Sequence, residues 1–300
     1  MLHDAATAAD LVLKEATTRR ALEALRAEWT ALWERCPKAT PFQSPAWLLP
    51  WWSCFGAGDL WTLVLRQDER LVGLAPLYVR ADGANGRRIV RLLGTGNTDY
   101  LDVLLEPNLE AAGVERVLRH LDRHRARWDR GDFQQLRPDS PLLAAAVPDE
   151  WSDETTVQDA CPVLTLPERA ADQDARIPAR FLKDLRYYRR RAEREREVAF
   201  EAADADNLDE LFAALLRLHR ARWEERGETG VLAAERVQRF HERAAADLLA
   251  RGRLRCYALR LDGQIVAGYY GFADARRHYY YLSGFDPAFG RLSPGHLIVH

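Results

Sequence analysis

Cysteine and methionine are scarce in this chain of 300 residues, which has 4 Cys, 1 Met, 14 Pro and 18 Gly. Cys36, Cys54, Cys161 and Cys256 form neither a C-x-x-C pair nor a metal-ligand spacing. This argues against a disulfide framework or a zinc site and favours buried thiols in a reducing compartment. Pro and Gly show no excess, and with 47% hydrophobic residues the composition excludes a disordered or fibrous chain.

A large excess of one charge and long apolar runs are also missing. The formal net charge of -2 excludes a globally basic nucleic-acid-binding protein, although it leaves room for a local basic patch. No run approaches the roughly 18 apolar residues that a membrane-spanning helix needs. Residues 1–15 lack the basic segment followed by an apolar run that marks a signal peptide. We therefore expect a cytoplasmic protein without a membrane span.

What the sequence does contain is a repeat. Residues 65–73, LRQDERLVG, are similar to residues 259–267, LRLDGQIVA, which lie 194 positions later in the chain. Each copy ends one apolar run, turns at an Asp and begins a second apolar run, which is the pattern of a β-hairpin. The spacing is too long for solenoid repeats of roughly 20–50 residues and predicts a duplicated domain of ordinary size.

Helices followed by a three-stranded meander are predicted in each half of the chain. In the first half we expect helices at 19–36, 42–52 and 111–128, and strands at 60–66, 71–79, 87–93 and 133–136. In the second half we expect helices at 181–197, 208–223 and 237–248, strands at 254–261, 264–273 and 278–285, and the start of a further helix at 296–299. The polar segment 167–178 indicates a domain boundary.

The order of two helices, a meander, a turn with Gly and a helix resembles the GNAT acyltransferase fold. The second half carries the resemblance through LKDLRYYRRR (182–191), LHRARW (218–223) with Gly227, LDGQIVA (261–267), YLSGFDP (281–287) and LSPG (292–295). The first half adds FQSPAW (42–47) and DYLD (99–102). Together they are similar to the Fem-like acetyltransferases, a group that includes cellulose- and exopolysaccharide-synthesis proteins and the Fem-type peptidyl transferases.

This resemblance implies an α/β fold of tandem GNAT-like domains, with mixed, mostly antiparallel sheets flanked by helices. The first domain would span residues 1–170 and the second residues 171–300. The second copy has few residues after its third strand, so we expect it to be truncated after the helix that starts near residue 295.

The resemblance also implies a donor site for acetyl-CoA or another acyl-CoA, without a metal. A strand edge and an anion-binding loop at a helix N-terminus would hold the donor; the residues are Leu282, Ser283, Gly284, Phe285, Arg291, Ser293, Pro294, Gly295 and His296. The usual loop has the form Q/R-x-x-G-x-G/A, whereas residues 291–296 keep the Arg and place Gly fifth. This departure leaves two alternatives open: a simple turn, or aminoacyl-tRNA as the donor.

Acyl transfer to an amine needs a base that removes the ammonium proton. The resemblance makes Asp99 the first candidate and Asp102 the second, in a loop that could face a cleft between the domains. The alternative is that Asn97–Asp99 only caps a turn through side-chain hydrogen bonds.

The candidate substrate-binding residues are Gln43, Trp47, Tyr100, Lys183, Arg186, Arg190 and Trp223. Lys183, Arg186 and Arg190 share one helix face and could bind a nucleotide-linked or lipid-linked sugar, or the phosphates of a tRNA. The alternatives are purely structural: the three cations would form a solvated charged face, and the Trp residues would pack in the core.

Two histidines stand four apart on the helix expected at 111–128. His120 and His124 could bind a metal, but no third ligand is evident. His219 has no visible catalytic partner.

The function expected from all these features is an N-acyltransferase that moves an acetyl or other acyl group to an amine of an amino-sugar or similar envelope or exopolysaccharide precursor. The alternatives are a Fem-type peptidyl transferase that uses aminoacyl-tRNA and an inactive GNAT-like binding module.

Overall fold

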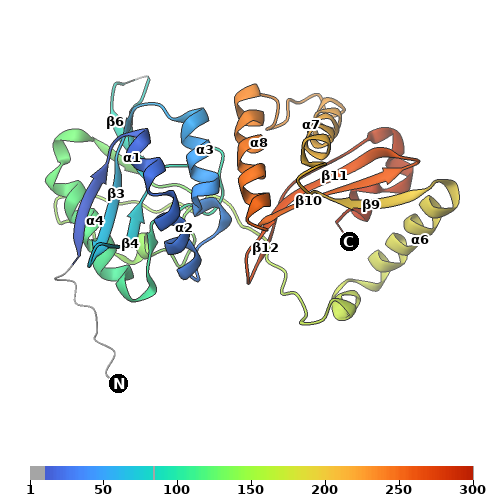
Figure 1. The fold of residues 1–300 in the computed structure, drawn as a ribbon, viewed down its shortest axis with the longest axis horizontal. Coiled ribbons are helices and arrows are strands. Elements are labelled where there is room, and N and C mark those ends of the chain that lie inside the picture. Colours follow the sequence, from blue (N-terminus) through green and yellow to red (C-terminus); the bar gives the residue numbers. More distant parts are fainter. Residues whose placement is uncertain (1–10, 84, 300) are drawn as a thin grey trace. The chain divides into compact units, whose positions relative to one another are not determined.

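The computed structural model describes residues 11–83 and 85–299, and the chain divides into two compact units (Figure 1). Unit 1 comprises residues 1–158 and unit 2 residues 159–300, so the division falls earlier in the chain than the polar segment 167–178. Residues 1–10, in which no signal peptide is expected, lie outside the described residues. Among the described residues, none of the helices has the length and apolar character needed to cross a membrane.

Unit 1 combines two small sheets with helices. Its helices are α1 (Arg19–Ala24), α2 (Arg26–Arg35), α3 (Pro45–Phe55), α4 (Glu110–Arg123) and α5 (Pro141–Ala144), with 3-10 turns η2 (Pro41–Gln43), η3 (Pro107–Leu109) and η4 (Arg125–Arg127). Its strands are β1 (Val12–Ala16), β2 (Asp59–Leu60), β3 (Thr62–Gln67), β4 (Arg70–Ala75), β5 (Leu77–Ala81), β6 (Arg88–Leu92), β7 (Leu104–Leu105) and β8 (Arg130–Asp132).

Two continuous segments of the chain, residues 59–67 and 70–81, each contribute one strand to each sheet of unit 1. One sheet has the order β1-β3-β4-β7 and the other β2-β5-β6-β8. Only Trp61 separates β2 from β3, and only Pro76 separates β4 from β5. Because Pro has no N–H to donate, the hydrogen-bond ladder is interrupted at Pro76. The strand expected at 71–79 is therefore two strands, one in each sheet.

Three further expectations for unit 1 need correction. The helix expected at 19–36 is divided into α1 and α2 at Leu25, whose N–H donates to the carbonyl oxygen of Leu22 in a tight turn. The helix expected at 111–128 ends at Arg123. The strand expected at 133–136 is instead β8, at residues 130–132, which pairs in parallel with β6.

Unit 2 has one antiparallel sheet in the order β12-β11-β10-β9. Its strands are β9 (Val198–Ala202), β10 (Leu254–Leu261), β11 (Gln264–Ala273) and β12 (His278–Phe285). Its helices are α6 (Ala179–Glu195), α7 (Leu208–Glu224), α8 (Glu235–Ala250) and α9 (Pro294–Leu297), with 3-10 turns η5 (Ala170–Arg176) and η6 (Pro287–Leu292).

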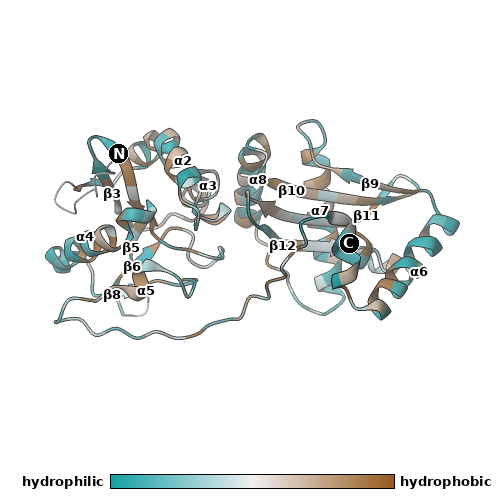
Figure 2. Cartoon of the chain, turned by 90° about the horizontal axis from the view of Figure 1, so that it is seen from below, coloured by the Kyte–Doolittle hydropathy of each residue, from teal (hydrophilic) through white to brown (hydrophobic). Residues whose placement is uncertain are grey.

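Helices cover both faces of this sheet. Tyr269 of β11 joins a core that includes Ala192 of α6 and Leu297 of α9. Its neighbour Tyr270 points to the opposite face, as successive residues of a strand do. There its ring contacts Phe212 of α7, with ring centroids 5.8 Å apart. Figure 2 shows α6 as largely hydrophilic, in keeping with a helix that buries one narrow face.

The sequence repeat is a structural repeat. The turn residues Asp68 and Glu69 have φ values of 48° and 60°, and their counterparts Asp262 and Gly263 have 49° and 81°. Two central residues with positive φ define the two-residue turn that suits twisted hairpins. Both hairpins also have a register shift at the equivalent place, after Leu65 in one and Leu259 in the other. The two predicted hairpins are thus confirmed.

The first strand of each unit was not expected from the sequence. β1 pairs antiparallel with β3, and β9 pairs in the same way with β10. Both are edge strands of five residues with mostly exposed or half-buried side chains. They lack the apolar alternation that marks a half-buried strand, which is why the pattern does not reveal them.

Candidate functional site

The last strand of unit 2, β12, lies at the edge of its sheet. β12 pairs with β11, with Leu282 opposite Tyr270 and Phe285 opposite Ala267. Its other edge pairs with no strand among residues 11–83 and 85–299. The register shifts between Tyr270 and Gly271, which leaves an extra residue on β12. Such a bulge bends a strand and turns its backbone groups in new directions. The edge at Leu282–Phe285 can therefore accept an extended ligand through main-chain hydrogen bonds.

Helix α7 lies directly against this strand. A Cβ atom on Gly284 would lie 2.6 Å from the backbone nitrogen of His219 and 2.8 Å from the carbonyl carbon of Leu218. Gly268, which pairs with Gly284 across the sheet, faces Leu215 of the same helix. The two glycines allow the helix backbone to approach closely and so bring His219 beside β12.

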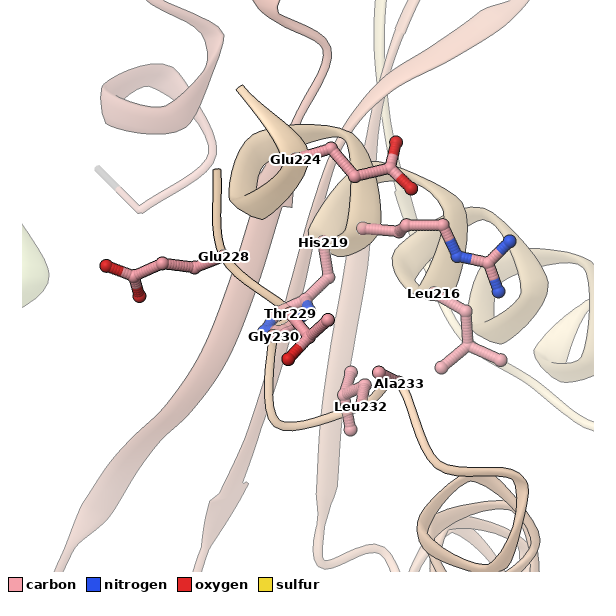
Figure 3. Close-up of a pocket in the computed structure, with 9 residues that line it drawn as sticks. Leu216, His219, Glu224, Glu228, Thr229, Gly230, Leu232 and Ala233 are labelled. Carbon is pink, nitrogen blue, oxygen red and sulfur yellow. The ribbon is translucent and has the colours of Figure 1, made fainter. Parts of the chain in front are cut away.

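The C-terminal end of α7 and the following loop enclose a cavity of about 100 Å³ (Figure 3). It is lined by Leu216, His219, Arg220, Glu224, Glu228, Thr229, Gly230, Leu232 and Ala233. Figure 3 shows the His219 ring next to the segment Thr229–Gly230. A Cβ atom on Gly230 would lie 2.7 Å from Nδ1 of His219, so the loop backbone packs on the imidazole.

His219 is 3% exposed and has a defined tautomer. Its Nε2 accepts a hydrogen bond from Nε1 of Trp223 at 2.9 Å. Because an indole nitrogen can only donate, Nε2 holds the lone pair and the proton of the neutral ring is on Nδ1. Burial, followed by the charge of Arg222, lowers the pKa of His219. The imidazole is therefore neutral at neutral pH.

The loop expected to bind an anion packs between β12 and α6. Ser293 has a left-handed conformation with φ 55°, and its Oγ lies 2.7 Å from Nδ1 of His296. A Cβ atom on Gly295 would lie 3.0 Å from the ring of Phe285. Pro294 begins the short helix α9 and is buried.

Arg291, in the same loop, already has an ionic partner. Its Nη2 lies 3.0 Å from Oε2 of Glu195 in α6. Both side chains are partly exposed, so this pair contributes little stability and can be exchanged for another anion. The predicted donor residues Leu282–Phe285 and Arg291–His296 thus lie together in one unit, next to α6.

The three predicted cations of α6 are all exposed. Arg186 forms an ion pair with Asp174 at 2.7 Å. Lys183 and Arg190 form no ion pair with any of the residues that the structure describes. Trp223, the remaining substrate-binding candidate of this unit, is half-buried against His219.

In unit 1, the two candidate bases occupy different environments. Asp102 is 7% exposed and lines a cavity of about 20 Å³. Burial raises the pKa of Asp102 to about 6. Hydrogen bonds with the Ser140 side chain and the Val103 N–H lower this pKa, but their effect is smaller than that of burial. Asp99 is half-buried, and burial raises its pKa as well.

The other predicted residues of unit 1 gather around the same loop. Gln43 accepts a hydrogen bond from the Thr40 N–H at 2.9 Å and so stabilises the turn η2. Trp47 is completely buried and donates to Oγ1 of Thr98 at 2.9 Å. The Tyr100 carbonyl oxygen accepts a hydrogen bond from Oγ1 of Thr40 at 3.4 Å. The structure thus shows packing and capping contacts for Gln43 and Trp47, while their role in substrate binding stays a prediction.

The surroundings of His219 do not follow from the sequence. Glu224, Thr229 and Gly230 line its cavity because the loop after α7 folds back over the helix end. The only sequence signal for this is the pair of glycines in RGETG, residues 226–230. A loop that folds back leaves no periodic pattern, so its contacts follow only from the tertiary structure.

All four cysteines are free thiols. Cys36 and Cys256 are buried as expected, whereas the expectation is wrong for Cys54, which is half-buried, and for Cys161, which is exposed. Burial raises the pKa of both Cys36 and Cys256 to about 12. These two thiols are therefore protonated and inert at neutral pH.

Comparison with known proteins assigns the fold. Residues 179–300 match the family model described as "Acetyltransferase (GNAT) domain". No curated protein matches the chain. Among solved structures, the crystal structure of FemX is similar over 96% of this chain and 84% of that chain, with a TM-score of 0.62 and 9% sequence identity.

Two further structures are less similar. A conserved protein of unknown function from Bacteroides thetaiotaomicron has a TM-score of 0.49 and 13% identity, over 96% of this chain and 86% of that chain. An aminoglycoside acetyltransferase from an uncultured soil metagenomic sample has a TM-score of 0.33 and 12% identity, over 52% of this chain and 98% of that chain. The chain thus has a mixed α/β fold that is similar to FemX across both units, with a GNAT acetyltransferase-type domain in unit 2.

Proposed function

We propose that this protein is an acyl-CoA-dependent N-acyltransferase whose unit 2 binds the donor. The observation that carries the proposal is the unpaired edge of β12 beside the loop 291–296, within the segment that matches the GNAT domain model. The amide groups of the donor's arm would pair with the backbone of Leu282–Phe285. Arg291, released from Glu195, would pair with the donor's phosphates.

In the proposed reaction, the acceptor amine attacks the thioester carbonyl of the donor. A C–N bond forms, the C–S bond breaks, and the thiol of coenzyme A leaves. The amine must first lose a proton, and Asp99 and Asp102 are the proposed acceptors. A pKa of about 6 supports Asp102 in this role, because a base works best when its pKa is near the working pH.

The proposed acceptor is an amino sugar or a similar precursor in envelope or exopolysaccharide chemistry, as in the cellulose-biosynthesis-type relatives of the Fem-like group. The exposed cations Lys183 and Arg190 support an acceptor that carries phosphate, such as a nucleotide-linked or lipid-linked sugar.

A second candidate is a Fem-type transferase that uses aminoacyl-tRNA. It is favoured by a stripe of exposed side chains along α6: Arg180, Lys183, Tyr187, Arg190 and Arg194. Their spacing of three, four, three and four residues puts all five on one helix face. The four cations form no ion pair within the described part of the chain, so they are available to phosphates.

Calorimetry with acetyl-CoA, followed by a free-thiol assay with amino sugars, tests the proposal. We expect acetyl-CoA to bind, and Arg291→Ala to weaken this binding. Arg189→Ala is a matched control, since Arg189 pairs with Glu193 on α6 away from the loop. Binding of aminoacyl-tRNA without acetyl-CoA would favour the second candidate. Binding of a nucleotide sugar with no thiol release from any acyl-CoA would favour an inactive binding module.

A further inference from the structure

Unit 1 contains a second cluster of reactive side chains, away from the loop of Asp99 and Asp102. One carboxylate oxygen of Glu15 and one ring nitrogen each of His120 and His124 lie within 4.8 Å of one another. The sequence shows the two histidines but no third ligand. The third ligand comes from β1, 105 positions before His120.

The fold brings these three residues together from two elements. Glu15 lies in β1, opposite Leu63 of β3. His120 lies in the last turn of α4 and His124 is its C-cap, four residues further on, and the two rings lie side by side with centroids 4.2 Å apart. At this end of the helix, the helix dipole and free carbonyl groups favour a positive charge.

The hydrogen bond of His124 prepares its ring for coordination. Nδ1 of His124 lies 2.8 Å from the backbone oxygen of His120. A carbonyl oxygen can only accept, so Nδ1 holds the proton and the lone pair of the neutral ring is on Nε2. A hydrogen bond from one imidazole nitrogen to a backbone carbonyl is the usual arrangement for a histidine that binds a metal through the other.

The carboxylate of Glu15 is held by hydrogen-bond donors from neighbouring side chains. Nε1 of Trp61 donates to Oε1 at 2.8 Å, and Nη1 of Arg127 donates to Oε2 at 3.1 Å. Arg127 itself lies over the Trp61 ring, 4.1 Å from its centroid. Nε2 of His120 lies 2.7 Å from Oε1 of Glu15. These contacts fix the carboxylate, as outer-shell hydrogen bonds do for a metal ligand, although the charge of Arg127 opposes a cation.

We propose that Glu15, His120 and His124 bind a divalent transition-metal ion of the zinc class, with water in the remaining position. Two imidazoles and one carboxylate form a three-ligand set that suits Zn²⁺ and leaves one coordination position open. The side chains of Glu15 and His120 are 26% and 17% exposed, so an ion can reach them from solvent. The bound ion would link β1 to α4. This site is separate from the proposed donor site and does not depend on the proposed function.

The test is calorimetric titration of the full chain with ZnCl₂ after dialysis against a chelator, with Co²⁺ absorption in the visible range as a second readout. We expect wild type to bind one Zn²⁺, and His124→Ala and Glu15→Gln each to weaken binding by at least about 10-fold, the loss that even an outer-shell change causes. Arg119→Ala is the control, since Arg119 lies on the same helix and pairs with Glu115.

Glu15→Gln keeps an oxygen that can accept from Trp61, so it separates metal binding from folding. Circular dichroism of each variant checks that the fold is retained. If wild type binds no Zn²⁺, or if both ligand variants bind it as tightly as wild type, the cluster only joins β1 to α4 by hydrogen bonds and the proposal is wrong.

Discussion

At the scale of single residues, burial controls the chemistry of Asp102. Its carboxyl group has a pKa of about 6 in the folded chain, against 3.8 for the ordinary group, mainly because it is removed from water. The folded state therefore binds this proton more tightly than the unfolded state does. The stabilisation from the protonated form is complete below about pH 4 and is lost as the pH rises through about 6.

We predict that Asp102→Asn stabilises the chain at pH 8 by up to about 3 kcal/mol, because the neutral amide carries no desolvated charge. The difference from wild type should disappear below about pH 4. Denaturant unfolding at several pH values measures it. The exposed Asp153→Asn is the control, and an equal effect of both variants would show that burial of Asp102 is not the cause.

The two hairpin turns provide a second test at this scale. Glu69 has φ 60°, a left-handed conformation that is unfavourable for a residue with a Cβ atom, whereas its counterpart Gly263 adopts φ 81° without strain. We predict that Glu69→Gly stabilises unit 1 and Gly263→Ala destabilises unit 2, each by about 1 kcal/mol. Thermal unfolding of the two variants should show shifts of opposite sign; shifts of the same sign would contradict the strain argument.

At the scale of elements, the close contact between α7 and β12 organises unit 2. Gly284 leaves no room for a side chain, because the helix backbone at His219 occupies that space. The same contact positions His219 and Trp223 beside the strand whose edge is the proposed donor site. A change at this contact should therefore affect both stability and donor binding.

We predict that Gly284→Ala lowers the free energy of unfolding by about 1–3 kcal/mol, the usual effect of overpacking, and weakens binding of acetyl-CoA. Gly290→Ala is the matched control: it lies in η6, and a Cβ atom there would meet nothing within 4 Å. Chemical denaturation and calorimetry measure the two effects. A Gly284→Ala chain as stable as the control would mean that α7 can move away from the strand without cost.

The elements also show where sequence patterns succeed. The Asp-Gly turn at 262–263, the hairpin strands around it and the amphipathic helices α7 and α8 all follow from local periodicity and turn chemistry. The strands β1 and β9 do not follow from such patterns, because exposed edge strands need no apolar alternation. The strand expected at 71–79 is divided into β4 and β5, because Pro76 between them breaks the ladder.

At the scale of the whole molecule, the boundary between the two units falls within a segment that has no regular secondary structure. Residues 151–167 form no helix or strand, and Val157 and Val163 are exposed at 89% and 88%. Exposed segments without regular structure are the preferred sites of proteolysis. The compact units on either side bury their own apolar side chains.

We predict that brief digestion with proteinase K cleaves first within residues 151–167 and yields two fragments of roughly half the chain each. Trypsin is the control: the sequence has no Lys or Arg between Arg137 and Arg169, so trypsin cannot cut within residues 151–167. Mass spectrometry of the fragments locates the cuts. First cleavage inside α7 or the β10–β11 hairpin would contradict this division.

The sequence by itself determined the repeated hairpin, the turn in each copy and the amphipathic helices α7 and α8, because these depend on residues that are neighbours along the chain. The tertiary structure alone decided that Arg291 meets Glu195, that a loop covers His219 and that Glu15 joins His120 and His124. Such contacts join residues far apart in sequence. They depend on strand register and on how each helix lies on its sheet, which no local pattern records.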